Sequence, residues 1–129
     1  MSSKMIRVVI ESPYAGDIDA NIAYAKRCVL DCLRRGEAPY ASHLFFTQPG
    51  ILDDSDPLQR ALGIEAGLAW GEVTAFVVVY IDRGISPGMR TGIQAARRRG
   101  CYVHLRALDR DVTKADEAEL ETITAEAWR

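Results

Sequence analysis

The sequence has no long apolar run and no large excess of either charge. No stretch approaches the roughly 20 apolar residues that a membrane-spanning helix needs, and the first residues lack the apolar core of a signal peptide. The 16 Lys and Arg side chains nearly balance the 18 Asp and Glu side chains, so no overall field attracts the protein to a polyanion. We therefore expect a cytoplasmic protein whose partners include neither nucleic acid nor a membrane.

Cysteine is also scarce. The 3 cysteines leave one unpaired under any pairing and show no C-x-x-C spacing, which indicates reduced thiols. Cys28 and Cys32 share one face of a predicted helix, as two metal ligands can, but no histidine or second cysteine pair accompanies them. We interpret both as core residues, since free cysteine is among the most buried residue types. We expect neither a metal nor a cofactor.

The sequence does contain a regular alternation of strand and helix patterns. We treat residues 1–129 as a single domain, a length that suffices for one sizeable core. Short apolar segments typical of strands cover residues 6–10, 38–42, 74–81 and 101–105. Helical patterns begin near residues 21, 56, 86 and 113, the last covering about 113–129. This order predicts an α/β fold, a small doubly wound parallel sheet with helices on both faces.

Two segments between these elements are less regular. Pro39 limits the second strand to a short or edge position, because proline donates no hydrogen bond to a sheet, and His43 follows that strand. Residues 44–56 form a connection longer than usual, of a kind often found in lids. In the helix that comes next, Trp70 is predicted to lie in the core.

The helix that begins at Ser86 is the first candidate for a binding site. Ser86 suits the N-cap and Pro87 the first helical position, directly after the most apolar segment of the chain. Free amides at the N-terminus of a helix favour an anionic group such as phosphate. Arg90, in the first turn, is either a contact to that phosphate or an ordinary solvated charge.

In a doubly wound sheet, ligands bind beyond the carboxyl ends of the strands, where the strand order reverses. This rule groups three loops: residues 12–21, the residues from 43 onward, and residues 82–90. Asp17 is then either a ligand contact or an ordinary cap. His43 is either a general acid or base, because an imidazole titrates near neutrality, or a hydrogen-bonded structural residue.

Three short motifs resemble those of a known family. Glu11-Ser-Pro-Tyr-Ala-Gly16 follows the first strand, Leu68-Ala-Trp70 precedes the central strand, and Ser86-x-Gly88 opens the next helix. In their order and spacing, over residues 5–105, they resemble the nucleoside 2-deoxyribosyltransferase superfamily. That superfamily includes nucleoside and nucleotide N-glycosidases and many small proteins of bacteria and phages.

The resemblance implies a flavodoxin-like, doubly wound parallel sheet of four to five strands and a nucleoside or nucleotide as ligand. It also implies a homodimer or higher homo-oligomer in which a neighbouring subunit completes each site. By position, the loop at Tyr14, Gly16 and Asp17 would face sugar and base, and Ser86 would match a phosphate-contacting serine. Together with the grouped loops, the expected ligand-binding residues are Ser12, Tyr14, Gly16, Asp17, Asn21, His43, Ser86, Gly88, Met89 and Arg90.

The chain departs from this family at both catalytic carboxylates. The family's nucleophilic glutamate corresponds to Gly92, and a second carboxylate corresponds to Gly67. Cleavage of a glycosidic bond uses one carboxylate at the anomeric carbon and one acid for the leaving group, and glycine supplies neither. Acids in the loops remain, and Asp17 and Asp82 are the first candidates to replace them.

Three functions therefore stay open. The first is an N-glycosidase or deoxyribosyltransferase whose acid has moved to a loop, which would make the protein an enzyme. The second is a protein of a bacterium or phage that senses or sequesters a nucleotide-derived ligand without turnover. The third is an oligomeric assembly protein that reuses the fold.

Overall fold

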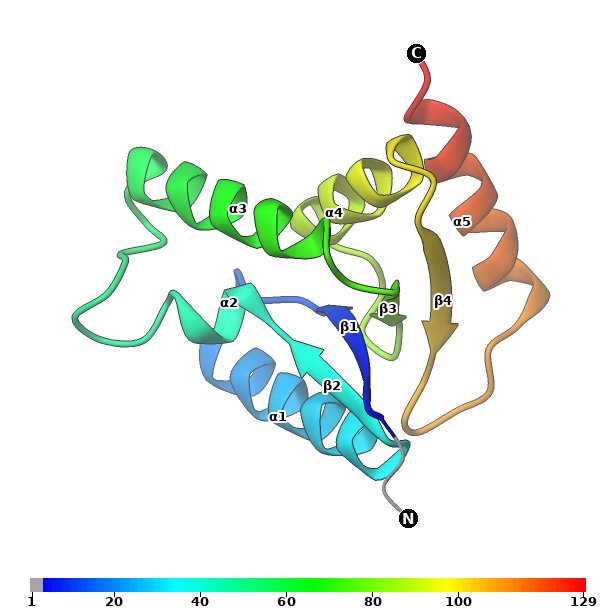
Figure 1. The fold of residues 1–129 in the computed structure, drawn as a ribbon, viewed down its shortest axis with the longest axis horizontal. Coiled ribbons are helices and arrows are strands. Elements are labelled where there is room, and N and C mark those ends of the chain that lie inside the picture. The colour runs from blue at the N-terminus through cyan, green and yellow to red at the C-terminus, as the bar shows by residue number, and fades with distance from the viewer. Residues whose placement is uncertain (1–3) are drawn as a thin grey trace.

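The computed structural model describes residues 4–129, in which strands and helices alternate (Figure 1). The strands are β1 (Ile6–Glu11), β2 (Glu37–Tyr40), β3 (Phe76–Tyr80) and β4 (Tyr102–Arg106). The helices are α1 (Ile18–Arg34), α2 (Ser42–Phe45), α3 (Pro57–Gly71), α4 (Pro87–Arg98) and α5 (Lys114–Glu126). None of these helices is long and apolar enough to cross a membrane.

The four strands pair in parallel in one sheet, in the order β2-β1-β3-β4. Val9 of β1 lies opposite Val77 of β3, which lies opposite Val103 of β4. The chain first winds from β1 to β2 and then returns past β1 to β3 and β4, so the strand order reverses between β1 and β3. The predicted flavodoxin-like, doubly wound α/β fold is confirmed, with four strands.

Helices cover both faces of this sheet. On one face, α1 buries Tyr24, Cys28 and Cys32 against Val8 and Ile10, which confirms that these cysteines are core residues. On the other face, α4 and α5 pack against β3 and β4. This second part of the core contains Val77, Val79, Met89, Ile93, Val103, Leu120 and Ile123.

Helix α3 departs from this arrangement. It extends away from the sheet and packs against α2 and α4 (Figure 1). Among the described residues of α3, Gly71 alone is buried, whereas Leu58 is 82% exposed and Trp70 is 58% exposed. The prediction that Trp70 lies in the core is therefore wrong, because its ring packs only at the margin of the sheet, 6.0 Å from the ring of Tyr40 at the end of the edge strand β2.

Two boundaries differ from the predicted ones. The strand β2 ends at Tyr40 and residues 42–45 form α2, so His43 lies on a short helix and does not close a strand. The helix α1 begins at Ile18, earlier than residue 21, because the Asp17 side chain accepts a hydrogen bond from the Ala20 amide and acts as N-cap.

A buried ion pair joins the two edge strands. Arg106 donates hydrogen bonds of 2.7 Å and 2.6 Å to the two carboxylate oxygens of Glu37, and both side chains are 8% exposed. Glu37 begins β2 and Arg106 ends β4, so the twist of the sheet brings these diagonal corners together. The hydrogen bonds from Arg106 lower the pKa of Glu37, so the pair is ionised at neutral pH.

Replacing Glu37 with alanine is expected to lower the free energy of unfolding by about 3–5 kcal/mol, because the Arg106 charge would stay buried without its partner. Urea denaturation at neutral pH measures this loss. The control is Arg27→Ala, which removes an ion pair to Asp109 whose side chains are 54% and 60% exposed. We expect that exposed pair to contribute less than about 1 kcal/mol. Equal losses in the two variants would contradict the role assigned to the buried pair.

Candidate functional site

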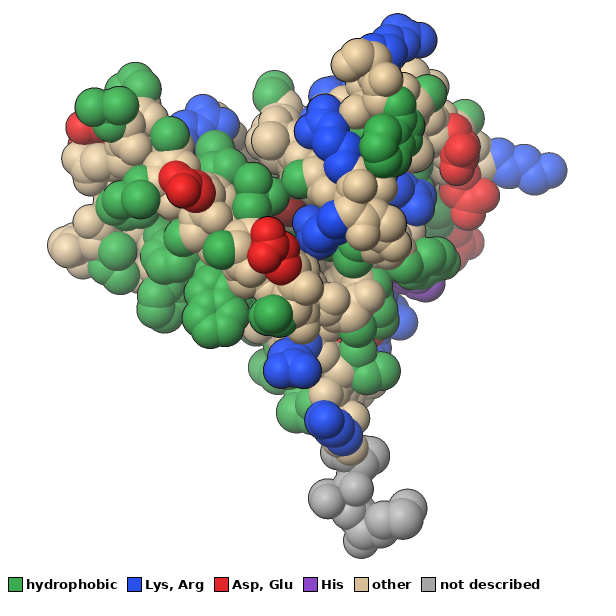
Figure 2. Space-filling model, turned by 45° about the horizontal axis from the view of Figure 1, so that its top comes forward, with side chains coloured by type: hydrophobic (Ala, Val, Ile, Leu, Met, Phe, Trp, Pro, Cys, Tyr) green, Lys and Arg blue, Asp and Glu red, His purple; other side chains and the backbone are tan. Residues whose placement is uncertain are grey.

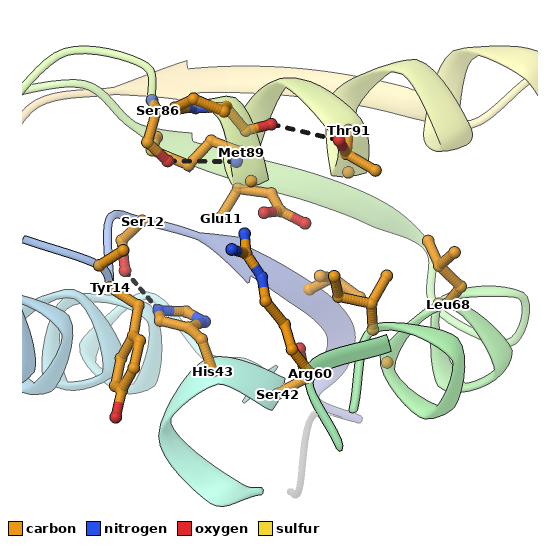
Figure 3. Close-up of a pocket in the computed structure, with 18 of the residues that line it drawn as sticks. Glu11, Ser12, Tyr14, Ser42, His43, Arg60, Leu68, Ser86, Met89 and Thr91 are labelled. Atoms are coloured by element: carbon orange, nitrogen blue, oxygen red, sulfur yellow. Dashed lines mark hydrogen bonds between the residues drawn. The ribbon is translucent and has the colours of Figure 1, made fainter. Parts of the chain in front are cut away.

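A cavity of about 250 Å³ opens at the carboxyl ends of β1 and β3. Its walls come from the residues after β1, from α2 and α3, and from the beginning of α4 (Figure 3). The strand order reverses at this position, where doubly wound sheets bind ligands. Six of the residues expected from the sequence line this one cavity: Ser12, Tyr14, His43, Ser86, Gly88 and Met89.

The first turn of α4 forms one wall of the cavity. Ser86 is the N-cap, its Oγ accepts a hydrogen bond of 3.3 Å from the Met89 amide, and Pro87 occupies the first helical position, as predicted. Met89 is 1% exposed and anchors this turn in the core. The amide of Gly88 has no partner within the helix, as is usual in a first turn, so it remains available to a ligand.

Arg60 of α3 reaches across the cavity to this turn. A Cβ atom on Gly88 would lie 3.8 Å from Nη2 of Arg60, so the guanidinium lies within contact distance of the turn. In Figure 3 the guanidinium of Arg60 points into the cavity. A second arginine, Arg99, lines the cavity where α4 ends. Helix amides and guanidinium groups both attract anions, so this cavity suits an anionic ligand.

Ser12 and His43 form a polar pair in the cavity wall. Ser12 is 5% exposed, and its Oγ lies 2.6 Å from Nε2 of His43. Burial lowers the pKa of His43 to about 4, so its imidazole is neutral at physiological pH. Among residues 4–129, no carboxylate is hydrogen-bonded to His43. His43 is thus a weak base for activating Ser12 as a nucleophile. Of the two interpretations of His43, the structural one agrees better with this geometry.

Glu11 is the residue that our sequence reasoning missed. It ends β1 and lines the cavity, and its side chain has no hydrogen bond or ion pair among the described residues. Burial raises its pKa to about 8, and the nearby charge of Arg99 offsets only part of that effect. The available signal was an acidic residue at the carboxyl end of a buried strand, next to the switch point.

Two glycines make room for close contacts around the cavity. A Cβ atom on Gly92 would lie 2.5 Å from Cδ and 2.9 Å from Oε1 of Glu11, so the carboxyl group occupies the space of a side chain at position 92. A Cβ atom on Gly67 would lie 2.7 Å from Oγ of Ser42, so α2 packs directly against α3 there. The two positions that carry carboxylates in the resembled family are therefore sites of close packing in this chain.

Four of the expected site residues do not line the cavity. Asp17 caps α1, Gly16 forms a turn with φ +99°, and Asn21 donates hydrogen bonds of 2.9 Å and 3.0 Å to the carbonyl oxygens of Tyr14 and Ala15. These contacts hold the loop that carries Tyr14. Arg90 forms an ion pair of 2.9 Å with Glu126 of α5, so its side chain points to α5.

Asp82 also has a structural role. Its carboxylate accepts hydrogen bonds of 2.5 Å from the hydroxyl of Tyr24, 2.9 Å from the amide of Leu108 and 2.8 Å from the amide of Asp109. Burial by itself raises the pKa of Asp82, but these hydrogen bonds outweigh burial and hold the pKa below its ordinary value. Asp82 thus ties the end of β3 to the loop after β4, outside the cavity.

This fold and the place of its cavity define a doubly wound α/β protein with a site at the switch point. The family model described as "Domain of unknown function (DUF7768)" matches residues 6–106, and the chain belongs to this family. The matched region includes every residue that lines the cavity. No curated protein matches the chain significantly.

A solved structure with a similar fold is that of the 2-deoxyribosyltransferase from the psychrotolerant bacterium Bacillus psychrosaccharolyticus. The TM-score is 0.59 at 12% sequence identity, and the match covers 92% of this chain and 90% of that chain. At this identity the likeness shows the fold alone, and the function has to be argued from the geometry of the site.

The imidazole of His43 is expected to stay neutral down to about pH 4, since burial lowers its pKa from 6.5 to about 4. Between these values the unfolded chain binds a proton that the folded chain does not, so acidification from pH 6.5 to pH 4 favours unfolding. NMR titration of the imidazole protons measures the pKa, and a His43→Asn variant assigns the signal. The variant should lose less stability over this pH range. A His43 pKa at or above 6.5 would contradict the burial argument.

Proposed function

We propose that this protein binds a nucleoside 5′-monophosphate in the cavity, with the phosphate at the beginning of α4. The observation that carries the proposal is the meeting of Ser86, Gly88 and Arg60 on the same cavity as the Tyr14 loop. A helix N-terminus and an arginine both favour phosphate, and the arginine can make a bidentate contact to it.

The rest of the cavity suits a sugar and a base. Ile64, Leu68 and Val9 supply apolar walls, and Tyr14, which also lines the cavity, has an aromatic ring on which a base can stack. The volume of about 250 Å³ is small beside the roughly 300–1,000 Å³ of typical small-molecule pockets. The size therefore favours a mononucleotide over a dinucleotide cofactor.

We further propose that the protein acts on the N-glycosidic bond of this nucleotide by chemistry that differs from the resembled family's. This reaction class is that of the family whose sequence motifs the chain resembles, and Gly67 and Gly92 exclude side-chain carboxylates at the two positions where that family carries them. The alternative is a sensor or sequestering protein that keeps the pocket without turnover. A measurement of free base distinguishes the enzyme from the sensor, because only the enzyme releases the base from the nucleotide.

Nucleoside 5′-monophosphates are expected to raise the melting temperature, because a ligand that binds only the folded state stabilises it, by about 2.7 kcal/mol at 100 times Kd. A thermal-shift panel of ribonucleotides and deoxyribonucleotides, each compared with its nucleoside, measures this. Arg60→Ala should reduce the nucleotide shift more than the nucleoside shift, since only the nucleotide carries phosphate. The matched control is Arg34→Ala, an exposed arginine near the end of α1. Absence of any shift at millimolar nucleotide would contradict the proposal.

We also propose that the chain forms a homo-oligomer through α3. Phe45, Leu58 and Leu62 are 61%, 82% and 56% exposed, and Figure 2 shows hydrophobic side chains gathered on the side where α3 lies. Monomeric proteins rarely expose large contiguous apolar patches. Because α3 also carries Arg60 and Leu68 to the cavity, such pairing would hold one cavity wall in place.

Analytical ultracentrifugation tests the oligomer. The double variant Leu58→Glu, Leu62→Glu places two charges on one face of α3 and is expected to shift the protein to a monomer. The control is Leu30→Glu, which introduces the same charge at a leucine that is 45% exposed on α1. A wild-type protein that sediments as a monomer at micromolar concentration would contradict the proposal.

A further inference from the structure

Glu11 is a carboxyl group whose position has no structural explanation. It is partly buried in the cavity wall, and among residues 4–129 no hydrogen bond or ion pair satisfies it. The aspartates considered from the sequence differ in this respect, since Asp17 caps α1 and Asp82 accepts hydrogen bonds from three donor groups. Because Glu11 lines the cavity, its carboxyl group is open to a ligand there. Such a group in a cavity is a candidate for function.

The surroundings of Glu11 hold its carboxyl group inside the cavity. It extends from the end of β1 to the surface of α4, where Gly92 has no side chain to displace it (Figure 3). Burial favours the protonated form of this carboxyl group, and the charge of Arg99 opposes that effect only in part. The charged or titratable side chains that line the same cavity are Arg60 of α3, Arg99 at the end of α4, Asp54 of the loop before α3 and the neutral His43 of α2.

We propose that Glu11 is the proton donor of this site and that the reaction is hydrolysis of the N-glycosidic bond, an inference that rests on the proposed nucleotide ligand. The Glu11 carboxyl group lies against Gly92, about one helical turn beyond Gly88, so a nucleotide with its phosphate beside Ser86 would have its sugar near Glu11. Glu11 lies on the same cavity as this phosphate position and comes from a different element, so one ligand can reach both.

The step balances with one water molecule. Glu11 gives its proton to the leaving nitrogen of the base as the C1′–N bond breaks, and the bonding electron pair departs with the base. The resulting carboxylate faces the positively charged sugar and stabilises it. A water molecule then attacks C1′ from the face that the base has left and returns a proton to Glu11. The products are the free base and the sugar phosphate, and Glu11 is protonated again.

The protonation state of Glu11 agrees with this role. Burial raises its pKa to about 8, so most of the free protein carries the proton at pH 7. The general acid in glycoside cleavage is usually a carboxyl group whose pKa is raised by an apolar site. One carboxyl that acts first as acid and then as base would thus serve a site that has glycine at positions 67 and 92.

The test measures base release from the nucleotide panel by chromatography, beside the thermal shift. Glu11→Gln is neutral and similar in shape to the protonated side chain, so it should fold and still be stabilised by nucleotide. We expect it to release base at least about 100-fold more slowly than the wild type, because positioned acids typically contribute 10²–10⁴-fold. Glu11→Asp, which keeps an acid on a shorter side chain, should retain part of the rate. The matched control is Glu65→Gln, an exposed carboxylate on α3 that does not line the cavity.

The pH dependence of kcat/KM shows whether Glu11 acts as a general acid or as a general base. As an acid, Glu11 must be protonated in the free enzyme, so kcat/KM is expected to fall as pH rises through about 8. This decline should vanish in Glu11→Gln. A kcat/KM that rises through pH 8 in the wild type would show that the deprotonated form is required and would overturn the inference.

The remaining outcomes distinguish this inference from the proposed function. If nucleotides bind and the wild type releases base, but Glu11→Gln releases it equally fast, Glu11 is not the donor and the nucleotide site stands. If nucleotides bind and the wild type releases no base, the hydrolysis is overturned and the protein is a nucleotide-binding protein. If no nucleotide binds, both proposals fail.

Discussion

The reversal of strand order between β1 and β3 is the constraint on which the rest of the site depends. After β1 the chain turns to α1 on one face of the sheet, and after β3 it turns to α4 on the other face. The loops after these two neighbouring strands thus run in opposite directions. An opening remains between them at the carboxyl ends of the strands. Glu11 and Ser12 lie on one side of that opening and Ser86 lies on the other.

The third wall of the opening depends on helix packing away from the sheet. Helix α3 contacts α2 and α4, and its Gly67 lets Ser42 of α2 approach within the space of a side chain. This packing carries Arg60 and Leu68 to the cavity and leaves the opposite face of α3 exposed. The shape of the site and the exposed apolar surface therefore have the same cause. Helix α3 packs over the cavity, whereas the other long helices pack on a face of the sheet.

The carboxyl groups of Asp82, Glu37 and Glu11 differ in the hydrogen-bond donors around them. Asp82 and Glu37 accept several hydrogen bonds, which stabilise the ionised form, lower the pKa and fix the residue in a structural role. Glu11 has no such donors, so burial dominates and raises its pKa. The donors around these three carboxyl groups thus account for the opposite directions of their pKa shifts.

The sequence by itself determined the features that arise from neighbouring residues. The apolar strands, the N-cap Ser86 and the alternation of elements led to the doubly wound fold, because periodicity and capping act within a few residues. The rule for such sheets also located the loops of the site. Only the tertiary structure decided that Trp70 is exposed, that His43 lies on a helix paired with Ser12, and that Glu11 fills the space above Gly92. Each of these depends on contacts between segments far apart in the chain, and no local pattern of residues records such contacts.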